Sequence, residues 1–141
     1  MVDLVYPSPN SGSVNTAKLN ELLLTVVEKK TSNLLLMGDF NFPQIDWENE
    51  KCNAGEDHPA SLFYTTTKDA YLIQNQKEPT RHRVDQKPTL IDLILTNREE
   101  LVLDIATNAG IGKSDHATLI ISLSSNKEKD VFKFTTHLSQ R

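Results

Sequence analysis

The apolar positions of the chain follow two patterns near its N-terminal end. Residues 15–30 carry leucine and valine three and four positions apart, which is typical of an amphipathic helix that packs one face on a sheet. Asn15 or Thr16 is a suitable N-cap for this helix. Residues 33–37 (NLLLM) are instead continuously apolar, as in a strand that is covered on both faces. The pattern therefore predicts a surface helix followed at once by a central strand.

The rest of the chain alternates short apolar segments with polar connections. A second helix is expected within residues 59–73, where it runs into the start of a strand. Further strands are expected at residues 2–6, 90–96, 101–107 and 116–123. Loops are expected at 41–58, 74–89 and 108–115, and a turn or short helix at 97–100. Strands outnumber helices, and each connection is short or carries a single helix. This order predicts an α/β (α+β) fold with a mixed sheet.

Length and charge narrow the classes of protein to consider. A chain of 141 residues is one domain by default. We expect the domain to occupy residues 1–123, with a charged linker or tail at 124–141. The net charge of −4 argues against strong sequence-independent binding to nucleic acid, although it leaves room for a local basic patch.

The cysteine content and hydropathy point to an intracellular protein. Cys52 is the only cysteine, so no internal disulfide forms, which favours a reducing compartment. The N-terminus has no basic region followed by a long apolar stretch, as a secretory signal requires. No apolar run approaches the ~18 residues of a membrane-spanning helix, so we expect no membrane partner.

The first polar cluster, GDFN, follows the continuously apolar strand. Asp39 and Asn41 are two positions apart, so on an extended chain their side chains point the same way. A carboxylate accepts protons or binds a cation, and a carboxamide donates hydrogen bonds to an anionic oxygen. This pairing suits phosphoryl chemistry. A plain Asx turn that closes the strand accounts for the same residues.

Two more clusters accompany later strands. Asp92 stands within TLIDLIL, where a buried charge needs a partner such as a histidine, unless the residue faces solvent on a half-exposed strand. His116 ends SDH, at the start of the last strand, where a simple polar turn is the alternative. Asp115 and His116 are adjacent, so we expect their side chains to point apart. Convergence of such groups on one sheet edge is how many sites are built.

These motifs together resemble a known family. GDFN, IDLIL and SDH, in this order, resemble the endonuclease/exonuclease/phosphatase superfamily. The longer segments GDFNFPQIDW, EPTR, LIDLILTN and GKSDH look more specifically like the endonuclease domain of non-LTR retrotransposons, which is similar to abasic-site endonucleases. The resemblance runs from about Val5 to Leu123. It implies a four-layer α/β/β/α sandwich with mixed sheets and DNA phosphodiester cleavage with Mg²⁺, or with Mn²⁺. It also implies a nuclear location and a reverse transcriptase domain in the parent polyprotein.

The resemblance also implies roles for individual residues. Asp39 would orient or deprotonate the attacking water, and Asn41 would hydrogen-bond the attacked phosphate or help to hold the metal. Asp92 would pair with His116, and His116 would stabilise the transition state or transfer a proton.

Two further residues take roles from the same resemblance. Asp115 would be a peripheral metal ligand, so the implied metal set is Asp39, Asn41 and Asp115. Tyr6 would close its strand with the hydroxyl facing the phosphate. The turn that follows Tyr6 is YPSPNS, with Pro7 and Ser8 where this subgroup more often has a basic residue and a proline.

The family's N-terminal half carries an asparagine and a glutamate that is the principal magnesium ligand. The chain starts at the strand that ends in Tyr6, so we expect an N-terminally truncated domain, a partial sandwich with weak magnesium binding and little or no nuclease activity. Two alternatives remain open. One is a catalytically silent remnant that acts as a binding or structural module. The other is a different phosphoesterase of the superfamily, which the FPQIDW extension disfavours.

Basic and aromatic residues surround these motifs. Residues 81–83 (RHR), Lys87 and Lys113 either touch DNA phosphates or are solvated loop charges. Phe42 and Trp47 are expected to pack a loop rather than a base.

Overall fold

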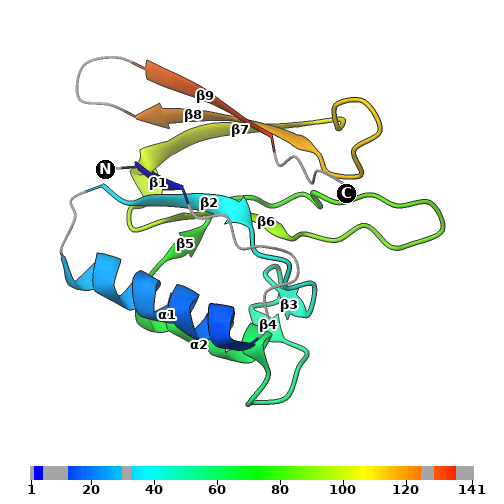
Figure 1. The fold of residues 1–141 in the computed structure, drawn as a ribbon. Coiled ribbons are helices and arrows are strands. Elements are labelled where there is room, and N and C mark those ends of the chain that lie inside the picture. Colours follow the sequence, from blue (N-terminus) through cyan, green and yellow to red (C-terminus); the bar gives the residue numbers. More distant parts are fainter. Residues whose placement is uncertain (1, 5–12, 30–32, 125–128, 136–141) are drawn as a thin grey trace.

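The computed structural model describes residues 2–4, 13–29, 33–124 and 129–135, arranged as Figure 1 shows. The helices and strands are β1 (Val2–Leu4), α1 (Ser13–Glu28), β2 (Leu35–Asp39), β3 (Ile45–Asp46), β4 (Lys51–Cys52), α2 (Pro59–Asp69), β5 (Ile73–Gln74), β6 (Asp92–Thr96), the 3₁₀ turn η1 (Glu99–Leu101), β7 (Val102–Asn108), β8 (Thr118–Ser124) and β9 (Lys129–Thr135). Among these residues, no helix has the length and apolar character needed to cross a membrane.

The described elements form three layers. Helices α1 and α2 cover one face of a four-stranded sheet with the order β1-β2-β6-β5, and a three-stranded sheet β7-β8-β9 covers the other face (Figure 1). The first sheet is mixed, because β1 runs parallel to β2 while β6 is antiparallel to both of its neighbours. The second sheet is antiparallel throughout. The predicted α+β class is confirmed, and the described residues supply an α/β/β stack.

Strand β2 shows why its sequence is continuously apolar. Leu36 belongs to the core between the sheet and the helices, which includes Leu23 and Phe63. Leu35 and Met37 belong to the separate core between the two sheets. Successive side chains of a strand point to opposite faces, so a strand buried on both faces needs apolar residues at every position.

The helix caps differ in part from the sequence prediction. Helix α1 begins at Ser13, so Asn15 and Thr16 lie inside its first turn rather than at the cap. Helix α2 is capped by His58, whose Nδ1 accepts a hydrogen bond from the backbone N–H of Ala60 at 3.0 Å. This histidine therefore has a structural role.

The segment expected to be a loop at 41–58 contains the short β3–β4 hairpin. Its aromatic residues pack on the core as predicted. The ring of Phe42 lies 4.8 Å from that of Phe63, and Trp47 meets Tyr64 edge to face at 5.6 Å. The hairpin is thereby fixed to helix α2, next to the end of β2.

The C-terminal segment differs from the expected linker. Residues 129–135 form β9, which pairs with β8 from Thr118 opposite Thr135 to Ser124 opposite Lys129. This strand was not predicted because residues 124–130 contain many charged residues, which are typical of a linker. Strand β9 makes β8 the central strand of the second sheet, and β8 follows directly after the SDH motif.

Candidate functional site

Two carboxylates face each other at the rim of the first sheet. Asp39 is the last residue of β2 and Asp92 the first of β6, and the antiparallel register places them opposite each other. Both share the strand face of their apolar neighbours Met37 and Ile94, which belong to the core between the sheets. Only 2% of Asp39 and 1% of Asp92 is exposed, so Asp92 is not a solvent-facing residue.

His116 reaches the same place from the second sheet. It stands two residues before β8, and its backbone pairs with that of Arg81. The next residue, Ala117, donates its N–H to the carbonyl of Thr80 at 2.6 Å. These contacts hold the imidazole between the two sheets, where it is 1% exposed.

The loop before His116 requires a glycine. A Cβ atom on Gly110 would lie 2.4 Å from the carbonyl oxygen of His116 and 2.6 Å from that of Ser114. Both are backbone atoms, so a side chain at this position forces the loop to move. Gly110 therefore permits the tight turn that presents His116, and sequence reasoning did not identify it.

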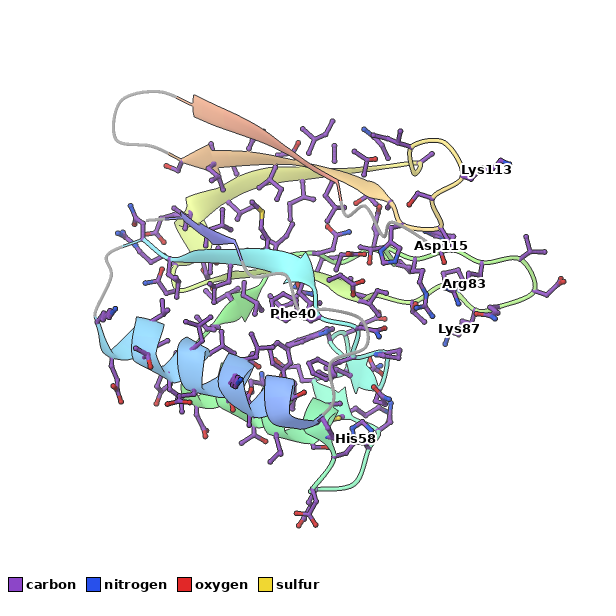
Figure 2. All side chains as sticks on the ribbon, viewed as in Figure 1. Phe40, His58, Arg83, Lys87, Lys113 and Asp115 are labelled. Atoms are coloured by element: carbon purple, nitrogen blue, oxygen red, sulfur yellow. The ribbon has the colours of Figure 1, made fainter. Side chains whose placement is uncertain are left out.

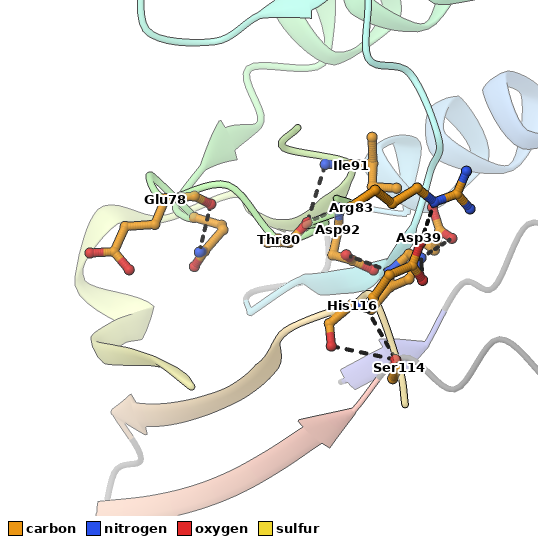
Figure 3. Close-up of polar contacts among 10 residues, drawn as sticks. Asp39, Glu78, Thr80, Arg83, Ile91, Asp92, Ser114 and His116 are labelled. Carbon is orange, nitrogen blue, oxygen red and sulfur yellow. Dashed lines mark hydrogen bonds and ion pairs between the residues drawn. The ribbon is translucent and has the colours of Figure 1, made fainter. Parts of the chain in front are cut away.

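The imidazole joins three carboxylates. Its Nδ1 lies 3.0 Å from Oδ2 of Asp92, and its Nε2 lies 3.9 Å from both Oδ2 of Asp39 and Oδ1 of Asp115. The predicted pairing of Asp92 with His116 is confirmed. A carboxylate accepts the hydrogen bond, so the proton on Nδ1 is fixed, as the contact between His116 and Asp92 shows (Figure 3). Nε2 therefore faces the other two acids.

The expectation that Asp115 and His116 point apart is wrong. Asp115 stands in a bend rather than in extended chain, so alternation does not apply to it. Its Oδ2 accepts a hydrogen bond from Nε of Arg83 in an ion pair. Partial burial raises the pKa of Asp115, but the hydrogen bond and charge of Arg83 outweigh burial and lower this pKa below its ordinary value.

The environment raises the pKa values of Asp39 and His116. Burial, followed by the charge of Asp92, raises the pKa of Asp39 to about 6, against the opposing effects of His116 and the backbone N–H of Asn41. Burial lowers the pKa of His116, but the hydrogen bond to Asp92 and the surrounding carboxylates reverse this and raise it. Groups of this kind are suited to proton transfer at neutral pH.

Thr80 is a supporting residue that the sequence did not single out. Its side chain is fully buried, and Oγ1 accepts hydrogen bonds from the backbone N–H of Ile91 at 3.2 Å and of Asp92 at 2.9 Å. Thr80 therefore joins the segment before Arg81 to the start of β6. The only available signal was its place in EPTR, one of the segments that carry the family resemblance.

Asn41 does not continue strand β2, contrary to the sequence prediction. Strand β2 ends at Asp39, and Asn41 has a left-handed backbone with φ of 51°. Asp39 and Asn41 are therefore not alternate residues of one extended strand, as the sequence prediction assumed. Asn41 is exposed, and its backbone N–H is hydrogen-bonded to the carboxylate of Asp39. Tyr6 lies outside the described residues.

The donor set fits a cation. Asp39, Asp92 and His116 each offer one ligand atom, and these atoms lie within 4.8 Å of one another. Among the described residues, Oδ1 of Asp39 and Oδ1 of Asp92 are buried acceptors without a hydrogen-bond partner. Carboxylate oxygens are the ligands that Mg²⁺ prefers. This cluster shares only Asp39 with the metal set that the sequence predicted, while Asp115 borders the cluster.

Comparison with known proteins identifies a family that the chain matches. Residues 2–120 match a family described as endonuclease-reverse transcriptase. The match covers the site, the first sheet, β7 and the start of β8. A search of curated proteins returned no match.

Proposed function

This chain belongs to the endonuclease-reverse transcriptase family, and from that premise we propose that it is a Mg²⁺-dependent endonuclease that hydrolyses DNA phosphodiester bonds. The observation that carries the proposal is the meeting of Asp39, Asp92 and His116 between two sheets. The three residues come from segments far apart in the chain. A structural ion pair needs two partners, whereas this cluster leaves carboxylate oxygens available to a cation and a substrate.

The proposed roles follow from the contacts. Asp92 holds the imidazole so that Nε2 is presented to a phosphate oxygen, on which negative charge develops during hydrolysis. Asp39 orients the attacking water and, with a pKa of about 6, accepts its proton near neutral pH. Asn41 donates to another oxygen of the attacked phosphate.

Asp39 belongs both to the buried cluster and to the metal set expected from the sequence. We propose that it holds the cation together with the bordering carboxylate of Asp115 and with Asn41, while Asp92 holds the imidazole. Bound Mg²⁺ supplies charge neutralisation for the phosphate. The family description also supports a nucleic-acid substrate and a linked reverse transcriptase domain in the parent protein. A nuclear location remains a proposal that rests on the resemblance alone.

The test is nicking of supercoiled plasmid under enzyme excess, so that a slow reaction is also detected. We expect Mg²⁺-dependent open circles that disappear with EDTA. Asp39→Asn and His116→Ala should each lower the rate at least about 100-fold, the usual contribution of a general base or an oxyanion donor. Asp104→Asn, an exposed carboxylate on β7, is the matched control. Nicking that survives both site substitutions contradicts the proposal.

The same variants separate the alternatives. Phosphate release from small esters without plasmid nicking identifies a phosphatase of the same superfamily. Binding of DNA without either reaction identifies a silent binding module.

A further inference from the structure

An ion pair joins the two loops that border the site. Arg83 belongs to hairpin 80–89, in which the N–H groups of Thr80 and Arg81 donate to the carbonyl of Thr89 at 2.9 Å. Asp115 belongs to the loop that presents His116. Nε of Arg83 donates to Oδ2 of Asp115, and Figure 3 shows Arg83 beside the buried cluster.

The backbone holds this hairpin in place without the ion pair. The N–H of His82 donates to the carbonyl of Asp115 at 2.7 Å, and the N–H of Ala117 donates to the carbonyl of Thr80 at 2.6 Å. Arg83 follows directly after this anchor. Its side chain can therefore exchange one partner for another while the hairpin stays where it is.

Arg83 and a divalent cation need the same carboxylate. Oδ1 of Asp115 lies 3.9 Å from Nε2 of His116, on the side that also holds Oδ2 of Asp39. A cation shared by Asp39 and Asp115 places two further positive charges next to the guanidinium, which weakens the ion pair. The ion pair in turn lowers the affinity of Asp115 for the cation. The two effects are reciprocal.

Arg83 is also well placed to meet DNA. Its side chain is 44% exposed, and Figure 2 shows Arg83, Lys87 and Lys113 on the same side of the molecule as Asp115. Lys87 and Lys113 are both exposed. The planar guanidinium matches the geometry of a phosphate group better than an ammonium does.

We propose that Arg83 is a phosphate-binding residue that Asp115 retains until a divalent cation binds. The cation takes over Asp115, and the released guanidinium then binds a DNA phosphate next to the one to be cleaved. This inference rests on the proposed function for its substrate. It makes cation binding and DNA binding cooperative, with Arg83 as the coupling residue.

The first experiment measures cation binding by the full chain without DNA. Free Mn²⁺ is followed by electron paramagnetic resonance during titration of the wild type, Arg83→Gln and Arg98→Gln. Arg83→Gln should bind Mn²⁺ about two- to fivefold more tightly, the range expected when an exposed ion pair no longer competes. Arg98, which pairs with Glu100 beyond the opposite end of β6, is the matched control and should leave the affinity unchanged. Equal or weaker Mn²⁺ binding by Arg83→Gln overturns the proposal.

The second experiment measures binding of a short DNA duplex in Ca²⁺ and in EDTA, with a denaturing gel to verify that the duplex is intact. In Ca²⁺, Arg83→Gln should bind more weakly, and its slope of log affinity against log salt should be shallower by about 0.9, the loss of one phosphate contact. In EDTA the two proteins should differ little, because Asp115 retains Arg83 in the wild type. Arg83→Lys should recover part of the affinity, since it restores the charge but not the planar group.

The outcomes separate this inference from the proposed function. If Arg83→Gln binds DNA in Ca²⁺ with the same affinity as the wild type, the proposed role of Arg83 is wrong. A wild type that fails to bind DNA in Ca²⁺ overturns both proposals. DNA binding and the expected Arg83 effects in a protein that never nicks DNA overturn only the proposed nuclease activity.

Discussion

The buried charge of Asp39 should make the protein less stable as the pH rises. An exposed aspartate has an ordinary pKa of 3.8, whereas the pKa of Asp39 in the folded protein is about 6. The folded state therefore binds the proton more tightly, and its advantage is complete below pH 3.8 and lost as the pH rises through 6. A difference of one pKa unit between the folded and unfolded states is worth about 1.4 kcal/mol, so the free energy of unfolding should fall by about 3 kcal/mol across this window.

The perturbation that isolates this effect is Asp39→Asn, which keeps the shape of the side chain and removes its charge. At pH 7.5 the variant should be more stable than the wild type by up to about 3 kcal/mol, and the difference should vanish near pH 4. The raised pKa of His116 acts in the same direction at higher pH, and its contribution is lost as the pH rises above 6.5. Asp39→Asn should therefore flatten the lower part of the pH profile.

Urea unfolding from pH 4 to 8 in EDTA measures these differences directly. Asp104→Asn, at an exposed position of β7, controls for the loss of one negative charge and should follow the wild-type profile. An Asp39→Asn variant that is less stable than the wild type at pH 7.5 would refute this account of the buried charge. A variant profile with the wild-type slope between pH 4 and 6 would refute it equally.

Three further predictions test the site. Gly110→Ala should lower the free energy of unfolding in urea by about 1–3 kcal/mol, because the added Cβ meets the carbonyl oxygen of His116. Gly55→Ala is the control and should change the free energy little, because nothing lies within 4 Å of its added Cβ. Thr80→Val should cost about 1–3 kcal/mol, because it leaves the buried N–H of Asp92 without its acceptor; unchanged stability in urea would contradict this. Mg²⁺ at about 100 times its dissociation constant should raise the stability of the wild type by about 2.7 kcal/mol at pH 7.5, and thermal unfolding with and without EDTA should show a much smaller gain in Asp39→Asn.

The sequence determined the elements that have strong local signals. The continuous apolar run of β2 reflects burial of the strand on both faces, and the helical period of α1 reflects burial of the helix on one face. Both patterns can be recognised in the sequence without knowing which segments pack against them. Physical reasoning showed that a buried Asp92 needs a partner such as a histidine, because a charge in an apolar strand needs a counterpart. The family resemblance then indicated His116 as that partner. The order of the motifs GDFN, IDLIL and SDH indicated the family.

Only the tertiary structure decided which polar groups meet. The opposition of Asp39 and Asp92 depends on the register of β2 against β6, and one residue of slip would turn either carboxylate to the helix side of the sheet. The approach of Asp115 to the imidazole depends on a bend, and its pairing with Arg83 depends on two backbone contacts between distant loops. Local sequence fixes which residues must be buried or paired, but contacts between distant segments fix their partners, because register and loop anchoring are properties of the whole fold.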